Sequence, residues 1–185
     1  MKKLMYLLFL IPLLVACGPG AASASAVGSS CDTLQPATAD VQYVLNFGRD
    51  LFTNEVWSRS YTVHEQEAIV SWTHRSVAAL SDVSILLFCS DNGTADLELY
   101  YNNDTLKEKF GNYDSVNVGA SCKNEDVILY ELDAAVEGAS YSIHQWLQPL
   151  NQTRLLSVVL VFPSEETALM EKYSQSFFPG LPACQ

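Results

Sequence analysis

The sequence predicts an α+β fold in which an antiparallel β-sheet carries a helix packed on it near the C-terminus. Apolar runs of strand length follow one another at Val127 to Leu132, Tyr141 to Leu147 and Leu155 to Phe162. One strongly amphipathic segment, Ser164 to Phe178, comes directly after them. Four cysteines spread through the same part of the chain predict two disulfides. An all-β sandwich with one appended helix is the alternative.

The first half of this region also reads mainly as strands. Period-two alternation or continuous apolar composition predicts strands at Val41 to Phe47, Val56 to Val63, Ala68 to Trp72 and Val83 to Cys89, with the last in the centre of the sheet. A turn at Asp91 to Gly93, a return strand at Leu97 to Tyr101 and a short helix at Asp104 to Phe110 follow.

Short connections arrange the last three strands as an antiparallel meander. Glu137-Gly138 and the Asn151 to Thr153 segment supply the turns. Pro163 ends the last strand, and Ser164 is the expected N-cap of the helix. The apolar face of that helix is expected to pack on the sheet, and it consists of Leu169, Met170, Tyr173 and Phe177.

The N-terminus carries an export signal. Lys2 and Lys3 precede an apolar run, Leu4 to Val15, which has the length of a signal-peptide core and is short for a membrane span. The run closes with Leu-Val-Ala before Cys17, a string that resembles the lipobox of bacterial lipoproteins. An ordinary signal peptide with a chance cysteine is the alternative.

The lipobox resemblance implies a domain organisation and a location. Residues 1–16 would be a signal peptide removed before Cys17, and acyl chains on Cys17 would hold the protein on an extracytoplasmic face of the bacterial cell membrane or outer membrane. Residues 17–30 then form the lipidated cysteine with a flexible Gly/Ala/Ser tether, and residues 31–185 a single globular domain.

The charge of the exported part is strongly negative. Without Lys2 and Lys3, eight of the ten basic residues remain against 21 acidic ones, a net charge of −13. Nucleic-acid binding needs clustered basic residues, so we expect no nucleic-acid partner. An anionic membrane would repel this body, so the anchor must be the lipid on Cys17.

The cysteines Cys31, Cys89, Cys122 and Cys184 remain for the body. An even number in an exported chain indicates disulfides, and four cysteines allow three connectivities. We favour Cys31–Cys184, which would clip the two ends of the domain, together with Cys89–Cys122. Zinc is the rival interpretation, but the sequence has no C-x-x-C pair.

Motifs for catalysis and cofactors are absent. No G-x-S-x-G occurs, and both Gly119-Ala120-Ser121 and Gly138-Ala139-Ser140 read as turns. The histidines His64, His74 and His144 are scattered and predict no shared metal site. A weak calcium candidate consists of Asp91, Asp96 and Glu98 around Gly93, although a plain Asn-Gly turn accounts for it better.

Aromatic residues could form a platform for carbohydrate or peptide, but packing in the core is the favoured account. They are Trp57, Tyr61, Trp72, Tyr100, Tyr101, Tyr113, Tyr141 and Trp146.

The strand–Pro–helix ending, from Leu155 through MEKYSQSFF, resembles the end of PsbP-like domains, small α/β/α sandwiches found in exported and lipid-anchored proteins. This resemblance implies an accessory or assembly role. We therefore expect a binding or accessory module for an envelope protein complex or ligand, and not an enzyme. An unrecognised carboxylate-based hydrolase and a structural envelope component are the alternatives.

Overall fold

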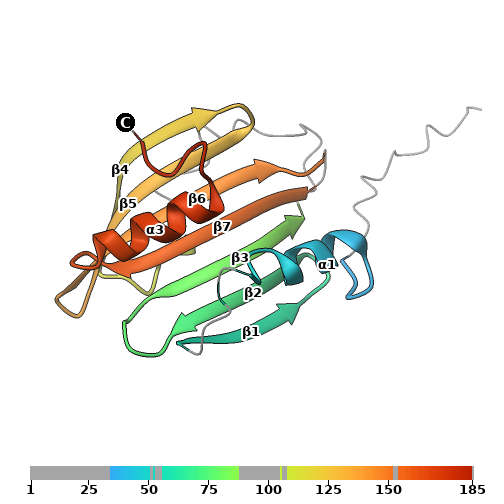
Figure 1. The fold of residues 1–185 in the computed structure, drawn as a ribbon, viewed down its shortest axis with the longest axis horizontal. Helices are drawn as coiled ribbons and strands as arrows, with labels where there is room; N and C mark the ends of the chain where they lie inside the picture. The colour runs from blue at the N-terminus through green and yellow to red at the C-terminus, as the bar shows by residue number, and fades with distance from the viewer. Residues whose placement is uncertain are drawn as a thin grey trace, which may run out of the picture.

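Among the residues that the structure describes, seven strands form one antiparallel sheet, and two helices pack against it (Figure 1). The computed structural model describes residues 34–50, 52, 56–87, 105, 108–151 and 154–184. The elements in chain order are α1 (Ala39–Asn46), β1 (Trp57–Val63), β2 (Glu67–His74), β3 (Leu80–Leu87), β4 (Ser115–Asn124), β5 (Val127–Val136), β6 (Ala139–Pro149), β7 (Arg154–Pro163) and α3 (Thr167–Phe177). The predicted antiparallel sheet with a C-terminal helix is confirmed.

The sheet consists of two meanders joined in the middle. Its strand order is β1-β2-β3-β7-β6-β5-β4, so β1–β3 and β4–β7 are each built from neighbours in sequence. Strand β3 pairs with β7 in a register that places Leu80 opposite Val161 and Leu87 opposite Arg154. The central position predicted for this strand is therefore right. The chain from β3 to β4 must cross from the middle of the sheet to its far edge.

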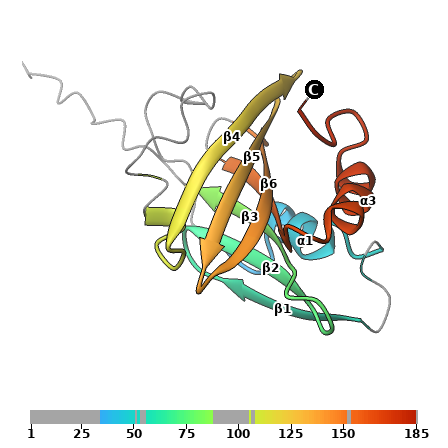
Figure 2. The same ribbon diagram turned by 90° about the vertical axis from the view of Figure 1, so that its left-hand side faces the viewer.

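Both helices lie on the same side of the sheet, which we call the helix face (Figure 2). Val41 and Val44 of α1 and Met170 and Tyr173 of α3 are buried there. On the opposite side, the crossover face, a second apolar cluster includes Phe110 from the β3–β4 connection. Each strand of the meander β5–β7 thus has apolar residues on both sides.

The face of α3 predicted to pack on the sheet does so. Met170 and Tyr173 are buried, and Leu169 and Phe177 pack partly buried against the same core. The Tyr173 hydroxyl accepts a hydrogen bond from Trp57 Nε1 at 2.8 Å, which ties the helix to the start of β1. The predicted cap is wrong, because the helix starts after Glu166 and Ser164 lies outside it.

Two other expectations are wrong. The segment predicted as a strand at Val41 to Phe47 belongs to helix α1, which buries Val41 and Val44, three residues apart on one face. The string Gly119-Ala120-Ser121 is not a turn but part of β4, beside a register shift between Val118 and Ala120. The Glu137-Gly138 turn is confirmed, and both residues have positive φ, as a tight hairpin requires.

The disulfide connectivity differs from the favoured one. Cys122 on β4 is bonded to Cys184, 62 residues later, so Cys31–Cys184 and Cys89–Cys122 are both wrong. The physical reason is the path of the C-terminal tail, which crosses β6 and β5 towards β4 and not towards the start of the domain (Figure 1). The side chain of Asn124 holds Gly180 on the way, with its Nδ2 2.9 Å from the carbonyl oxygen. Cys31 and Cys89 lie outside the described residues.

We predict that Cys31 and Cys89 form a second disulfide, because Cys122–Cys184 leaves no other pairing among the four cysteines of the body. The chain positions agree: Leu34 N–H donates to Glu65 O at 2.8 Å, and nearby Glu67 stands opposite Leu86 on β3. Peptide mapping of the thiol-trapped protein without reduction should recover both linked pairs. Linkage of Cys31 to Cys122 or Cys184 would contradict this connectivity.

Candidate functional site

Several of the predicted site residues lie outside the described part of the chain. This holds for the lipidation residue Cys17 and for the calcium candidate Asp91, Asp96 and Glu98. Within the described residues, no group of three or more His, Cys, Asp and Glu side chains could hold a metal ion.

The three histidines occupy three separate environments. His64 is exposed in the turn between β1 and β2. His74 ends β2, where its Nδ1 accepts the Val77 N–H at 3.0 Å and its ring meets Trp57 edge-on. Only His144 on β6 belongs to a larger polar network. The structure therefore does not bring the three histidine side chains together.

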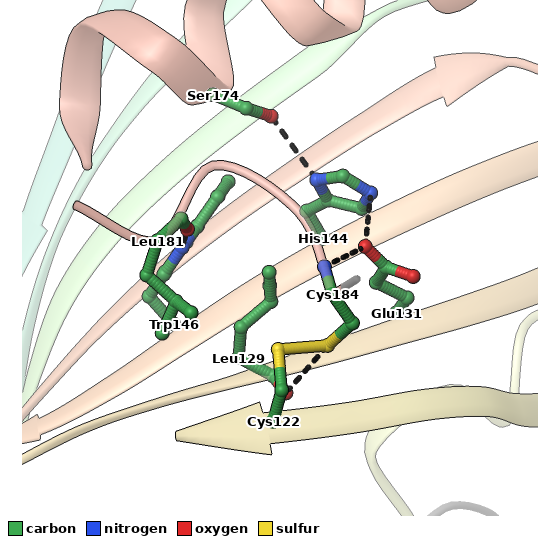
Figure 3. A network of polar contacts seen from close by, with 8 residues as sticks. All are labelled: Cys122, Leu129, Glu131, His144, Trp146, Ser174, Leu181 and Cys184. Carbon is green, nitrogen blue, oxygen red and sulfur yellow. Dashed lines mark hydrogen bonds and ion pairs between the residues drawn. A yellow bond between two sulfur atoms is a disulfide. The ribbon is translucent and has the colours of Figure 1, made fainter. Parts of the chain in front are cut away.

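The network around His144 joins the sheet, α3 and the C-terminal tail (Figure 3). His144 Nδ1 lies 3.0 Å from Ser174 Oγ on α3, and Nε2 lies 3.6 Å from Glu131 Oε1 on β5. The same Glu131 oxygen accepts the Cys184 N–H at 2.7 Å. One carboxylate therefore contacts both the histidine and the disulfide-bonded end of the chain.

The tail is held by further contacts beside this network. Trp146 Nε1 donates to Leu181 O at 2.8 Å, and the Trp146 ring stacks on Phe178 with centroids 4.9 Å apart. Together with Cys122–Cys184, these contacts fix residues 178–184 across β6, β5 and β4 (Figure 3). The tail thus covers part of the helix face.

The serine, histidine and carboxylate of this network are the residue types of a nucleophilic hydrolase. Their geometry does not serve that chemistry, because Ser174 lies on the sheet-facing side of α3, is 0% exposed, and no substrate can reach its hydroxyl. Burial is the main influence on the pKa of His144 and lowers it, while Glu131 and Glu171 only partly offset that effect. A neutral His144 is a hydrogen-bonding link between elements.

A polar band runs across the crossover face, and sequence reasoning missed it. Register places its members on that one face, and they are Gln145 on β6, Ser157 on β7, Ser84 and Asp82 on β3, and Ser71 on β2. Gln145 is 0% exposed and donates to Ser157 Oγ at 2.8 Å. Its signal in the sequence is weak, because β6 and β7 each contribute only one polar residue, Gln145 and Ser157, to an otherwise apolar face.

Two buried acceptor atoms of the polar band have no hydrogen-bond partner within the described part of the chain. They are Gln145 Oε1 and Asp82 Oδ1. The Ser71 hydroxyl bonds the Asp82 carboxyl, yet burial dominates and raises the pKa of Asp82. Leaving buried acceptors without a hydrogen bond costs free energy, so these two atoms destabilise the centre of the polar band.

The polar band continues into exposed hydroxyl groups towards the edge of the sheet. Ser58, Ser60, Thr62 and Thr73 lie on the same face and are exposed. The result is a hydroxyl-rich sheet surface with a partly buried carboxyl at its inner end. A surface of this kind suits hydrogen bonding to a partner.

The tryptophans support the packing account of the aromatic residues. Trp57, Trp72 and Trp146 are all buried in the core of the helix face. Tyr61 differs, because 61% of it is exposed on β1. Tyr100 and Tyr101 lie outside the described residues.

Comparisons with known proteins identify no relative of this chain. The chain matches no protein-family model, and no curated protein matches its sequence. Among the helices of the described ranges, none has the length and apolar character needed to cross a membrane.

We predict that the domain loses stability as the pH falls below about 6.5, the ordinary pKa of histidine. Burial lowers the pKa of His144 in the folded protein, so between the two values the unfolded chain binds more protons and unfolding is favoured. The contribution of neutral His144 to the free energy of unfolding is complete above pH 6.5. It is lost as the pH falls towards the lower pKa that His144 has in the folded protein. Urea unfolding at pH 7.5 and pH 5 measures it.

His144→Gln should flatten this pH dependence, whereas the exposed-site control His64→Gln should keep it. The raised pKa of Asp82 acts in the opposite sense, since it adds stability as the pH falls, but all three proteins share it. An unchanged slope in His144→Gln would show that His144 is not the group responsible.

Proposed function

We propose that this chain is a lipid-anchored, extracytoplasmic module that binds a protein partner in a bacterial envelope complex. The observation that carries the proposal is the lipobox-like string Leu-Val-Ala-Cys at residues 14–17, which closes an apolar run behind Lys2 and Lys3. Neither the acidic body nor any helix of the described residues offers another means of membrane attachment.

The disulfide supports export. Cys122–Cys184 joins two cysteines that lie 62 residues apart and closes the C-terminal tail onto β4. Bonds of this kind persist in oxidising compartments and are rare where thiols are kept reduced. An envelope surface outside the cytoplasmic membrane meets that condition.

The acidic residues near the start of the domain support a position of the domain away from the lipid headgroups. Leu34 lies at the β1–β2 turn, whose neighbours Glu65 and Glu67 are acidic. A Gly/Ala/Ser tether of the length of residues 18–30 spans roughly 20 Å. Because an anionic surface repels carboxylates, this end of the domain would stay clear of the headgroups and leave its faces accessible.

The polar band supports binding over catalysis. It leads into hydroxyl groups on an exposed sheet surface, those of Ser58, Ser60, Thr62 and Thr73, which can form hydrogen bonds with a partner. The Ser174–His144–Glu131 group, in contrast, is closed to substrate. The resemblance of the chain's ending to PsbP-like domains points to the same accessory role.

We predict that Cys17→Ser moves the protein from the membrane to the soluble fraction, because the thiol that carries the acyl chains is removed. Fractionation with salt and carbonate washes, together with labelled palmitate, measures both anchoring and lipidation. Ser25→Ala in the tether is the matched control and should stay bound and labelled. A Cys17→Ser protein that survives the washes on the membrane would refute the lipid anchor.

We predict that a photo-crosslinking amino acid at Thr73 captures a protein partner in native membranes. Thr73 is exposed on the crossover face beside the polar band, whereas the control position Lys172 is exposed on α3, on the opposite side of the sheet. The expected adduct depends on Asp82, so Asp82→Ala should weaken it. Equal adducts from Thr73 and Lys172, or none from Thr73, would contradict binding at this face.

A further inference from the structure

Strand β1 forms an open and regular edge of the sheet. It pairs with β2 over all seven residues without a register shift, and no described element lies on its other side (Figure 1). The opposite edge, β4, is interrupted by a bulge between Val118 and Ala120. Bulges and prolines protect strand edges from pairing with other chains, and β1 has neither.

The backbone groups of β1 that pair with no described strand can be identified. His64 N–H donates to Glu67 O and Arg75 N–H donates to Val56 O, each at 2.7 Å. Since hydrogen-bonded pairs alternate along an antiparallel ladder, the even-numbered residues of β1 bond to β2. The N–H and C=O groups of Arg59 and Tyr61 therefore point outward from the sheet.

The side chains along β1 are complementary to those of a second β1 strand that runs antiparallel to it. The Arg59 guanidinium lies 5.5 Å from the centre of the Tyr61 ring, so the two side chains already attract one another within one chain. Positive charge gathers near the start of β1, at Arg59 and Arg75, and negative charge near its end, at Glu65 and Glu67. Two antiparallel copies of this edge would bring opposite charges together.

We propose that β1 pairs with β1 of a second copy of this chain in a two-fold symmetric, antiparallel dimer. The register that pairs the whole strand places Ser60 opposite Ser60 of the second copy. Arg59 then faces the second copy's Tyr61, and the reverse contact forms by symmetry. The outward groups of Arg59 and Tyr61 supply the hydrogen bonds, and the two sheets continue into each other.

This register makes Ser60 the position nearest its own symmetry mate. Ser60 bonds to β2, so across the two-fold axis it forms a non-hydrogen-bonded pair, with Cα atoms about 4.5 Å apart. That distance allows a disulfide. Ser58 instead lies opposite the second copy's Thr62, and the two Ser58 Cα atoms stand about 14 Å apart.

We predict that Ser60→Cys forms a covalent dimer in native membranes under mild oxidation, visible on a non-reducing gel. Ser58→Cys and Thr62→Cys, on the same strand and face, should each stay monomeric alone but cross-link when co-expressed. Absence of the Ser60→Cys dimer, or equal cross-linking by all three single variants, would overturn the proposal.

The mass of the unaltered full chain in detergent, from sedimentation equilibrium, provides an independent test. A dimer is expected. Tyr61→Pro should dissociate it, because proline removes an outward N–H that no bond to β2 uses, and Tyr61→Ala is the control that keeps this donor. Far-UV circular dichroism verifies that both variants fold. A monomer for the unaltered chain at all concentrations would also overturn the proposal.

Discussion

The pairing of β3 with β7 is the constraint on which the rest of the structure depends. It joins two meanders that would otherwise be separate sheets, and it brings Val83 opposite Val158 in the buried centre. Helix α1 packs on β2 and β3, and α3 packs on β7, so this one ladder also brings both helices over the same core. Because its partners lie about 75 residues apart in sequence, its formation closes a long loop and is intrinsically slow.

Local pattern predicted the elements that alternation or periodicity governs. Strands β5, β6 and β7 and the packing face of α3 follow from apolar spacing alone. The sequence predicts a strand at the position of helix α1 because Val41, Tyr43 and Val44 are β-forming residues. The helical spacing of the apolar residues is weak there, and their burial against the sheet selects the helix. Strand β4 escaped prediction because an edge strand with little buried surface needs few apolar residues.

The candidate site was harder to predict than the fold, since its members meet only through strand register. Gln145, Ser157 and Asp82 belong to three strands, and no spacing in the sequence relates them. His144, Ser174 and Glu131 show the opposite difficulty, because their residue types suggest catalysis while the burial of Ser174 excludes it. The residue types of such a group suggest a role, and the access of a substrate to them decides whether the group can perform it.

The bond between Cys122 and Cys184 has a consequence for the way the protein matures. Cys184 comes 62 residues after Cys122 and follows helix α3, so this bond cannot close before strands β5 to β7 and α3 have been synthesised. With Cys31 paired to Cys89, each cysteine of the body would bond to the next one along the chain. A chain oxidised in that order reaches its native bonds directly and has little need of an isomerase to correct them.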